Sequence, residues 1–70
     1  MTQCEEPFEV SGTGPTKEDA NNKAYQNAKN FCERTLPECP KAKEVGPGKY
    51  EYDPNIGYTY TTRYKCTIEP

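Results

Sequence analysis

Four cysteines in a chain with very few large apolar side chains constrain the fold of this 70-residue protein most strongly. Leu, Ile, Val and Phe together occupy seven of the 70 positions, well below the roughly 20% that separates chains able to fold on such burial from those that are not. Domains this small bury only about 60% of their unfolded surface, and they commonly need disulfides or metals. The sequence therefore predicts one small domain, residues 1–70, whose stability depends on its cysteines.

The four cysteines are separated by 27, 6 and 26 residues: Cys4, Cys32, Cys39 and Cys66. Zinc-binding domains usually place two ligands close together and often add histidine, whereas this chain has no Cys-x-x-Cys pair and no histidine. We therefore expect two disulfides, with a four-cysteine zinc-stabilised domain as the alternative. Because disulfides persist in oxidising compartments, the expected location is secreted, periplasmic or at the cell surface.

The charge balance argues against a generic polyanion-coating protein. Nine Lys and Arg face eleven Asp and Glu, which gives a net charge of −2. A protein that neutralises many phosphates normally has a basic surplus. No apolar run approaches the length of about 18 residues that spans a bilayer, so no transmembrane segment is expected. The first residues have neither the basic start nor the apolar middle of a signal peptide, and any signal or anchor is expected to lie outside these 70 residues.

A helix is predicted from Lys17 to about Thr35, a stretch that is rich in Ala, Lys, Gln and Glu and contains neither Gly nor Pro. Thr16 is suited to be its N-cap, and Asp19 follows three residues later as in a capping box. The residues that recur at helical spacing form a narrow apolar stripe, which we expect to be buried. They are Ala20, Ala24, Ala28, Phe31 and Cys32.

A first strand is predicted before this helix, over residues 4–11. Its alternation places Cys4, Phe8 and Val10 on one side and polar residues on the other, as in a half-buried strand. Residues 12–15 read Gly-Thr-Gly-Pro, which is typical of a break between elements. We therefore expect the strand to end before these glycines.

A hairpin is predicted after the helix. Its first strand covers residues 42–52 and is interrupted at 46–48 by Gly-Pro-Gly, which indicates a bulge or kink. Its second strand covers residues 58–69, and residues 53–57 form the connecting loop. One face of the second strand carries Tyr58, Tyr60, Thr62, Tyr64, Cys66 and Ile68, and the other carries Thr59, Thr61, Arg63, Lys65, Thr67 and Glu69.

These elements predict an α+β fold, a two-layer β-α-β-β sandwich with one helix on a three-stranded antiparallel sheet. The expected strand order is 2-3-1, which places the last strand in the middle. Small alanines on the helix would face large tyrosines on the sheet, so that the rings fill the space between the layers. The tyrosines expected there are Tyr50, Tyr52, Tyr60 and Tyr64.

The same strand directions bring all four cysteines to one end of the molecule. We expect Cys4 to pair with Cys66 and Cys32 with Cys39, which would contribute about 4 and about 2.5 kcal/mol through loop closure. Because the sulfurs cluster, the pairings 4–32 with 39–66 and 4–39 with 32–66 remain open.

Residues 12–28 resemble the final strand-to-helix segment of double-stranded RNA-binding domains, whose pattern is G-x-G-x-S-K-K-x-A-K-x-x-A-A-x-x-A. The matching positions are Gly12, Gly14, Thr16 in place of Ser, Lys17, Ala20, Ala24 and Ala28. The resemblance implies an alanine face packed on a sheet, and RNA contact through Lys17. Glu18 and Asn21 occupy the other two basic positions of the family.

Few side chains in this sequence are suited to catalysis. Without histidine, Ser11 has no ordinary general base, and the Gly-x-Gly at positions 12 and 14 lacks the third glycine of a dinucleotide fingerprint. We expect no enzymatic activity, no cofactor and no metal.

The polar face of the last strand is the candidate binding face. It presents Thr59, Thr61, Arg63 and Lys65, with Tyr58 at the mouth of the hairpin as a possible anchor. Such a face is either a solvated surface with cross-strand salt pairs or a flat platform for a protein or glycan partner. The expected function is a non-catalytic interaction module, monomeric and with an unknown ligand, and nucleic-acid binding through Lys17 is the alternative.

Overall fold

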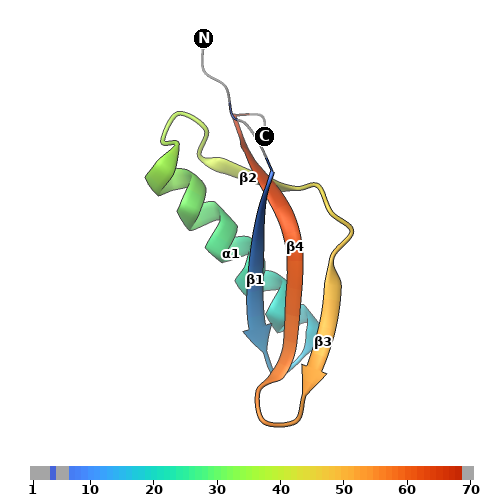
Figure 1. Cartoon of the computed structure of the whole chain (residues 1–70). Helices are drawn as coiled ribbons and strands as arrows, with labels where there is room; N and C mark the ends of the chain where they lie inside the picture. Colours follow the sequence, from blue (N-terminus) through green and yellow to red (C-terminus); the bar gives the residue numbers. More distant parts are fainter. Residues whose placement is uncertain (1–3, 5–6, 69–70) are drawn as a thin grey trace.

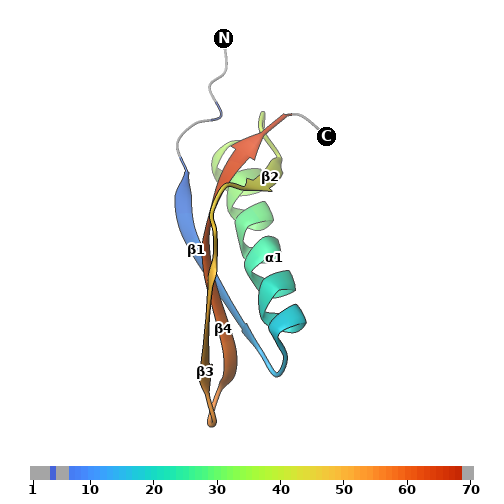
Figure 2. The same cartoon turned by 90° about the vertical axis from the view of Figure 1, so that its right-hand side faces the viewer.

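The computed structural model describes Cys4 and residues 7–68 and contains one helix packed on an antiparallel sheet (Figure 1). Strand β1 (Phe8–Gly14) leads into helix α1 (Lys17–Thr35), which is followed by β2 (Lys41–Glu44), β3 (Lys49–Asp53) and β4 (Gly57–Thr67). The helix covers one face of the sheet, and the other face is left open (Figure 2). The α+β class is therefore confirmed. Over the described residues, the helix does not combine the length and the apolar character that are needed to cross a membrane.

The sheet contains four strands instead of the predicted three. β1 pairs with one edge of β4, and both β2 and β3 pair with the other edge, all antiparallel. The predicted second strand is thus two strands, because residues 46–48 leave the ladder between them. The last strand is central and β1 lies on one side of it, as in the predicted order 2-3-1, but the other side of β4 holds the two strands β2 and β3 in place of one.

Capping residues mark both ends of the helix. The hydroxyl of Thr16 accepts a hydrogen bond from the amide of Asp19 at 3.1 Å, which confirms the predicted N-cap. Glu18 and Asp19 lie in the first turn and Arg34 in the last, as the helix dipole favours. Leu36 is the C-cap, and its amide donates to the carbonyl of Cys32 at 2.9 Å.

Strand β1 continues through the glycines that we expected to end it. Gly12 pairs with Tyr60 and Gly14 with Tyr58, and both glycines face the helix. A Cβ atom at Gly12 would lie 2.2 Å from the backbone nitrogen of Ala24. These glycines therefore allow the helix backbone to approach the strand closely, and they do not break the strand.

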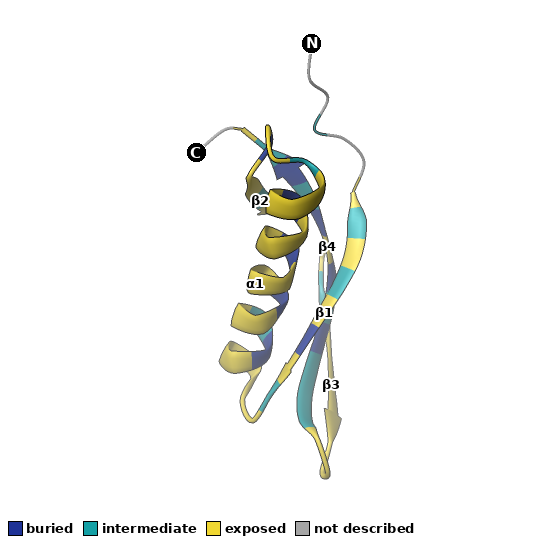
Figure 3. Cartoon of the chain, turned by 90° about the vertical axis from the view of Figure 1, so that its left-hand side faces the viewer, coloured by how far each residue is buried: buried dark blue, intermediate teal, exposed yellow. Residues whose placement is uncertain are grey.

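The core is a stripe of alanines against two tyrosines. Ala20, Ala24 and Ala28 have no exposed surface, and Tyr60 and Tyr64 are 6% and 3% exposed. Figure 3 shows this buried layer between α1 and β4. The helix packs on β1, β4 and β2 but has little contact with β3.

Three aromatic residues that we expected to be buried are exposed instead. Tyr52, on β3, is 63% exposed because the helix makes little contact with that strand. Tyr50, two residues earlier, is 38% exposed, although the side-chain amide of Asn21 donates a hydrogen bond to its hydroxyl at 3.2 Å. Phe31 is 44% exposed, and its ring lies 4.5 Å from that of Phe8 at the margin of the core. The buried stripe is therefore made of alanines and Cys32.

The cysteines gather at one end of the molecule, as expected, but the favoured pairing is wrong. The disulfides join Cys4 to Cys39 and Cys32 to Cys66, with Cα separations of 5.8 and 5.5 Å. Cys32 continues the alanine stripe toward the sheet, and Cys66 is on the helix side of β4, so these two meet in the buried layer. Cys39 then pairs with Cys4. All four sulfurs are in disulfides, so none is a thiolate for the alternative zinc site.

Candidate functional site

One face of the sheet is not covered by the helix (Figure 2). In an antiparallel sheet directly opposite residues share a face, so the register determines which side chains lie there. Thr59, Thr61, Arg63 and Lys65 all lie on this face, as the sequence predicts. The neighbouring strands add the residues that pair with this side of β4, which are Glu9, Ser11, Thr13, Lys41, Lys43, Lys49 and Glu51.

Basic side chains predominate toward the β2 end of this face. Lys43 lies directly opposite Lys65, and Lys41 lies two residue pairs further along, opposite Thr67. Arg63 lies two residues before Lys65 on the same side of β4, with Glu9 opposite it on β1. Like charges directly opposite one another destabilise a sheet, so the Lys43–Lys65 pair costs stability in the isolated fold. The carboxylates of β3 lie toward the hairpin end.

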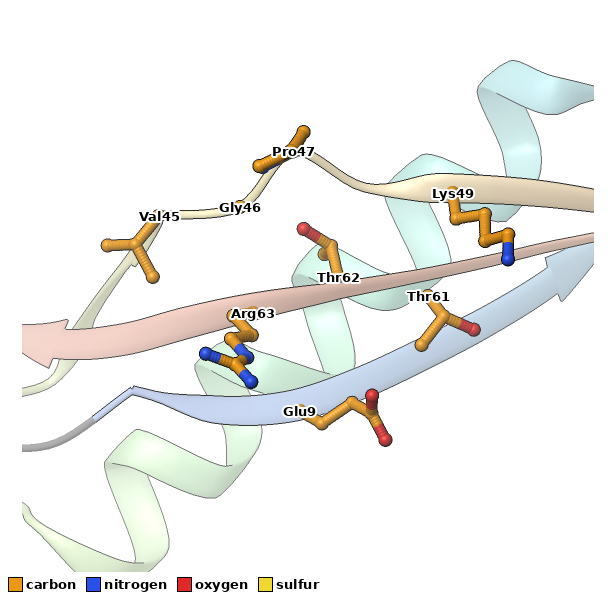
Figure 4. A pocket seen from close by; sticks show the side chains of 8 residues that line it. All are labelled: Glu9, Val45, Gly46, Pro47, Lys49, Thr61, Thr62 and Arg63. Atoms are coloured by element: carbon orange, nitrogen blue, oxygen red, sulfur yellow. The ribbon is translucent and has the colours of Figure 1, made fainter.

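A pocket opens in this face where β2 and β3 separate. It has a volume of about 350 Å³, and Figure 4 shows the side chains that line it. They are Glu9, Val45, Gly46, Pro47, Lys49, Thr61, Thr62 and Arg63. The pocket was not predicted from the sequence, although the Gly-Pro-Gly at 46–48 was recognised as an interruption of the strand.

The two glycines beside the pocket permit its shape. A Cβ atom at Gly46 would lie 2.4 Å from the hydroxyl oxygen of Thr62, and one at Gly48 would overlap the ring of Tyr60. Residues 46 and 48 therefore press against the helix-side layer. Val45 and Pro47 alternate with them and line the pocket on the open side.

Tyr58 is not on the open face. It is half-buried on the helix side of β4, where it packs against the cluster of Ala20, Ala24 and Tyr60. The ammonium of Lys17 lies 5.9 Å from the centroid of the Tyr58 ring and 5.4 Å from that of Tyr50. Tyr58 and the open-face residues are therefore on opposite sides of the sheet, and Lys17 makes cation–π contacts within the fold.

A polar network lies under the β2 edge on the helix side. The carboxylate of Glu44 accepts hydrogen bonds from the hydroxyl of Tyr60 and, at 2.7 Å, from that of Thr62. The hydrogen bond to Glu44, together with burial, raises the pKa of Tyr60. Burial, with a smaller contribution from the charge of Glu44, raises the pKa of Tyr64 to about 12. Both phenols are therefore neutral, and the network is structural in character.

Within Cys4 and residues 7–68, no group of three or more His, Cys, Asp or Glu side chains is placed to hold a metal ion. The comparisons with known proteins give no family, because no family model, curated protein or solved structure matches this chain. The open face and its pocket are therefore the features on which a function can be argued.

Proposed function

We propose that this chain is a non-catalytic binding module that acts outside the reducing cytosol and binds an anionic partner through the open face of its sheet. Two disulfides favour an oxidising, extracellular environment for the protein. The face carries many hydroxyl groups and cations, with a pocket between β2 and β3. Catalysis is not part of the proposal, because the chain has no histidine and all four of its cysteines are in disulfides.

The observation that carries the proposal is the direct opposition of Lys43 and Lys65, with Lys41 and Arg63 beside them. Repulsion between these side chains is relieved when an anionic partner lies over them, so binding offsets a cost that the free protein has. The chain as a whole has a net charge of −2, so this local basic surplus is not a consequence of overall composition.

The test is binding to immobilised polygalacturonate and polyglutamate, with uncharged dextran as the reference surface. Binding to the two polyanions should weaken as salt is raised, because exposed charges are screened. The double variant K43Q/K65Q should bind at least about ten-fold more weakly than wild type. The matched control is K23Q/K29Q on the exposed side of α1, which removes the same charge and should bind like wild type.

Equal losses in the two double variants would show that net charge alone controls binding, and the open face would then not be the site. Binding to double-stranded RNA that is lost in the variant K17Q would instead support the RNA-binding alternative. Because Lys17 also contacts the rings of Tyr50 and Tyr58, K17Q removes contacts within the fold. Circular dichroism must therefore show that the variant is folded before a loss of binding is assigned to Lys17.

A further inference from the structure

The pocket of Figure 4 results from a mismatch in length between the two sides of the ladder. β2 ends where Glu44 pairs with Tyr64, and β3 begins where Lys49 pairs with Thr61. Four residues, 45–48, therefore pass opposite only two residues of β4. The amide of Val45 still donates to the carbonyl of Arg63 at 2.8 Å, and beyond it the chain leaves the ladder. The pocket is therefore a consequence of the strand register and of the length of the segment between β2 and β3.

The walls of the pocket combine three kinds of chemistry. Arg63 and Lys49 supply two cations: Lys49 lies directly opposite Thr61, and Arg63 lies two residues after Thr61 on β4. Glu9, which is directly opposite Arg63 on β1, supplies a carboxylate. Val45 and Pro47 supply an apolar wall on the side of the loop. The volume of about 350 Å³ is at the small end of the range for small-molecule sites.

A ligand that satisfies all three walls must carry an anion, hydroxyl groups and an apolar surface. The guanidinium of Arg63 can bind a carboxylate through two parallel hydrogen bonds, and Lys49 can neutralise it further. Glu9 can accept hydrogen bonds from hydroxyl groups, but it repels a second anion. Val45 and Pro47 can contact the C–H groups of a ring. A polycarboxylate without hydroxyls repels Glu9 and offers it no hydrogen-bond donor, and a neutral sugar offers the cations no opposite charge, so we expect each to bind more weakly.

From this geometry we infer that the pocket binds a uronate residue, a sugar that carries a carboxylate, within an acidic polysaccharide. The inference rests on the proposed function, because the pocket lies in the open face, and it gives that face a ligand class. In this arrangement the lysines of β2 and Lys65 lie beside the pocket on the same face, where further uronate residues of an extended chain would pass. Arg63 and Glu9 are then the residues that determine specificity.

The test is an NMR titration of the oxidised, isotope-labelled protein with trigalacturonate, with galactotriose as the neutral counterpart and triglutamate as the acidic peptide. Trigalacturonate should shift amide signals of residues 45–49, Thr61 and Arg63 most strongly. Galactotriose and triglutamate should each bind at least about ten-fold more weakly. Equal binding of triglutamate would overturn the inference, since it would show that charge alone is recognised.

The variants R63Q and E9Q test the residues of the pocket. R63Q should lose at least about ten-fold in affinity for trigalacturonate, while R34Q, on an exposed position of the last helical turn, should bind like wild type. E9Q should weaken trigalacturonate but strengthen triglutamate, because it removes the repulsion. If polyanions bind through Lys43 and Lys65 while the pocket signals do not move, the pocket inference is wrong and the proposed function stands. If no polyanion binds, both are wrong.

Discussion

At the scale of single residues, the packing of α1 on β1 depends more on how closely the two backbones approach each other than on the size of the side chains between them. Gly12 is the clearest case, because a Cβ atom there would lie 2.2 Å from the nitrogen of Ala24 and 2.6 Å from the carbonyl oxygen of Ala20. Both contacts are to backbone atoms, which cannot move without separating the helix from β1. Tyr60 and Tyr64 then fill the remaining space beside the alanines. Glycine, alanine and tyrosine together replace the branched aliphatic residues that the chain lacks.

The variant G12A should therefore be strongly destabilised. We expect a loss of about 3 kcal/mol in the free energy of unfolding, the upper end of the usual cost of overpacking a tight core. Urea unfolding followed by circular dichroism measures it. The control is T13A, the next residue, whose side chain is exposed on the open face. Similar midpoints for G12A and wild type would contradict the close packing of β1 on α1.

The tyrosine network predicts a loss of stability at high pH. In the folded protein burial raises the pKa of Tyr64 from 10.0 to about 12, so the unfolded chain loses this proton first. The contribution of Tyr64 to the free energy of unfolding keeps its full value below pH 10 and falls between pH 10 and 12, by about 2–3 kcal/mol. The raised pKa of Tyr60 adds a decrease of the same sign.

The variant Y64F keeps the ring but removes the titrating group. Its free energy of unfolding, measured by urea titration at several pH values with short incubations, should fall less steeply between pH 10 and 12 than that of wild type. The exposed Tyr52 provides the control Y52F, which should keep the full slope. An unchanged slope in Y64F would show that Tyr64 titrates normally in the folded state.

At the scale of elements, each boundary has a local cause in the sequence. The Thr16 hydroxyl accepts a hydrogen bond from the Asp19 amide at the start of α1, and the helix ends at Leu36, before Pro37. In the hairpin, the carboxylate of Asp53 accepts a hydrogen bond from the amide of Asn55 at 2.8 Å. Gly57 has a φ of 103°, which only glycine adopts easily, and it begins β4.

The N-cap gives a prediction for the helix. T16A removes the acceptor for the Asp19 amide and should lower the free energy of unfolding by about 1 kcal/mol. T35A makes the same chemical change at the other, exposed end of α1, where it should have little effect. Thermal unfolding of both variants measures the difference. Equal midpoints for T16A and T35A would mean that the cap does not stabilise the helix.

At the scale of the whole molecule, the two disulfides connect distant parts of the chain. They link residues 35 and 34 positions apart, and loop-closure entropy gives each a contribution of about 4 kcal/mol. Since small domains are stable by only about 5–15 kcal/mol, reduction should remove most of the stability. A protein that unfolds at the same temperature with and without a strong thiol reductant would contradict this.

The pairing itself can be read directly, because trypsin should cleave the oxidised protein so that each cysteine lies on a different peptide. Cleavage after Lys17, Lys29, Arg34, Lys41 and Lys65 separates them. Mass spectrometry without reduction should find the peptide of Cys4 linked to that of Cys39, and the peptide of Cys32 linked to that of Cys66. A link between the peptides of Cys4 and Cys66 would contradict the structure.

The sequence by itself determined the helix from Lys17 to Thr35, its cap and the alternation of β4, because hydrogen bonding and periodicity within a few residues control these features. It also determined that the cysteines form two disulfides at one end. Only the tertiary structure decided which sulfurs meet, since that depends on how the Cys32 face of the helix lies over β4. The exposure of Tyr52 and the pocket beside Arg63 were decided in the same way, by where the helix ends over the sheet and where four residues pass opposite two. Such features depend on contacts between residues far apart in the chain, and no local pattern encodes them.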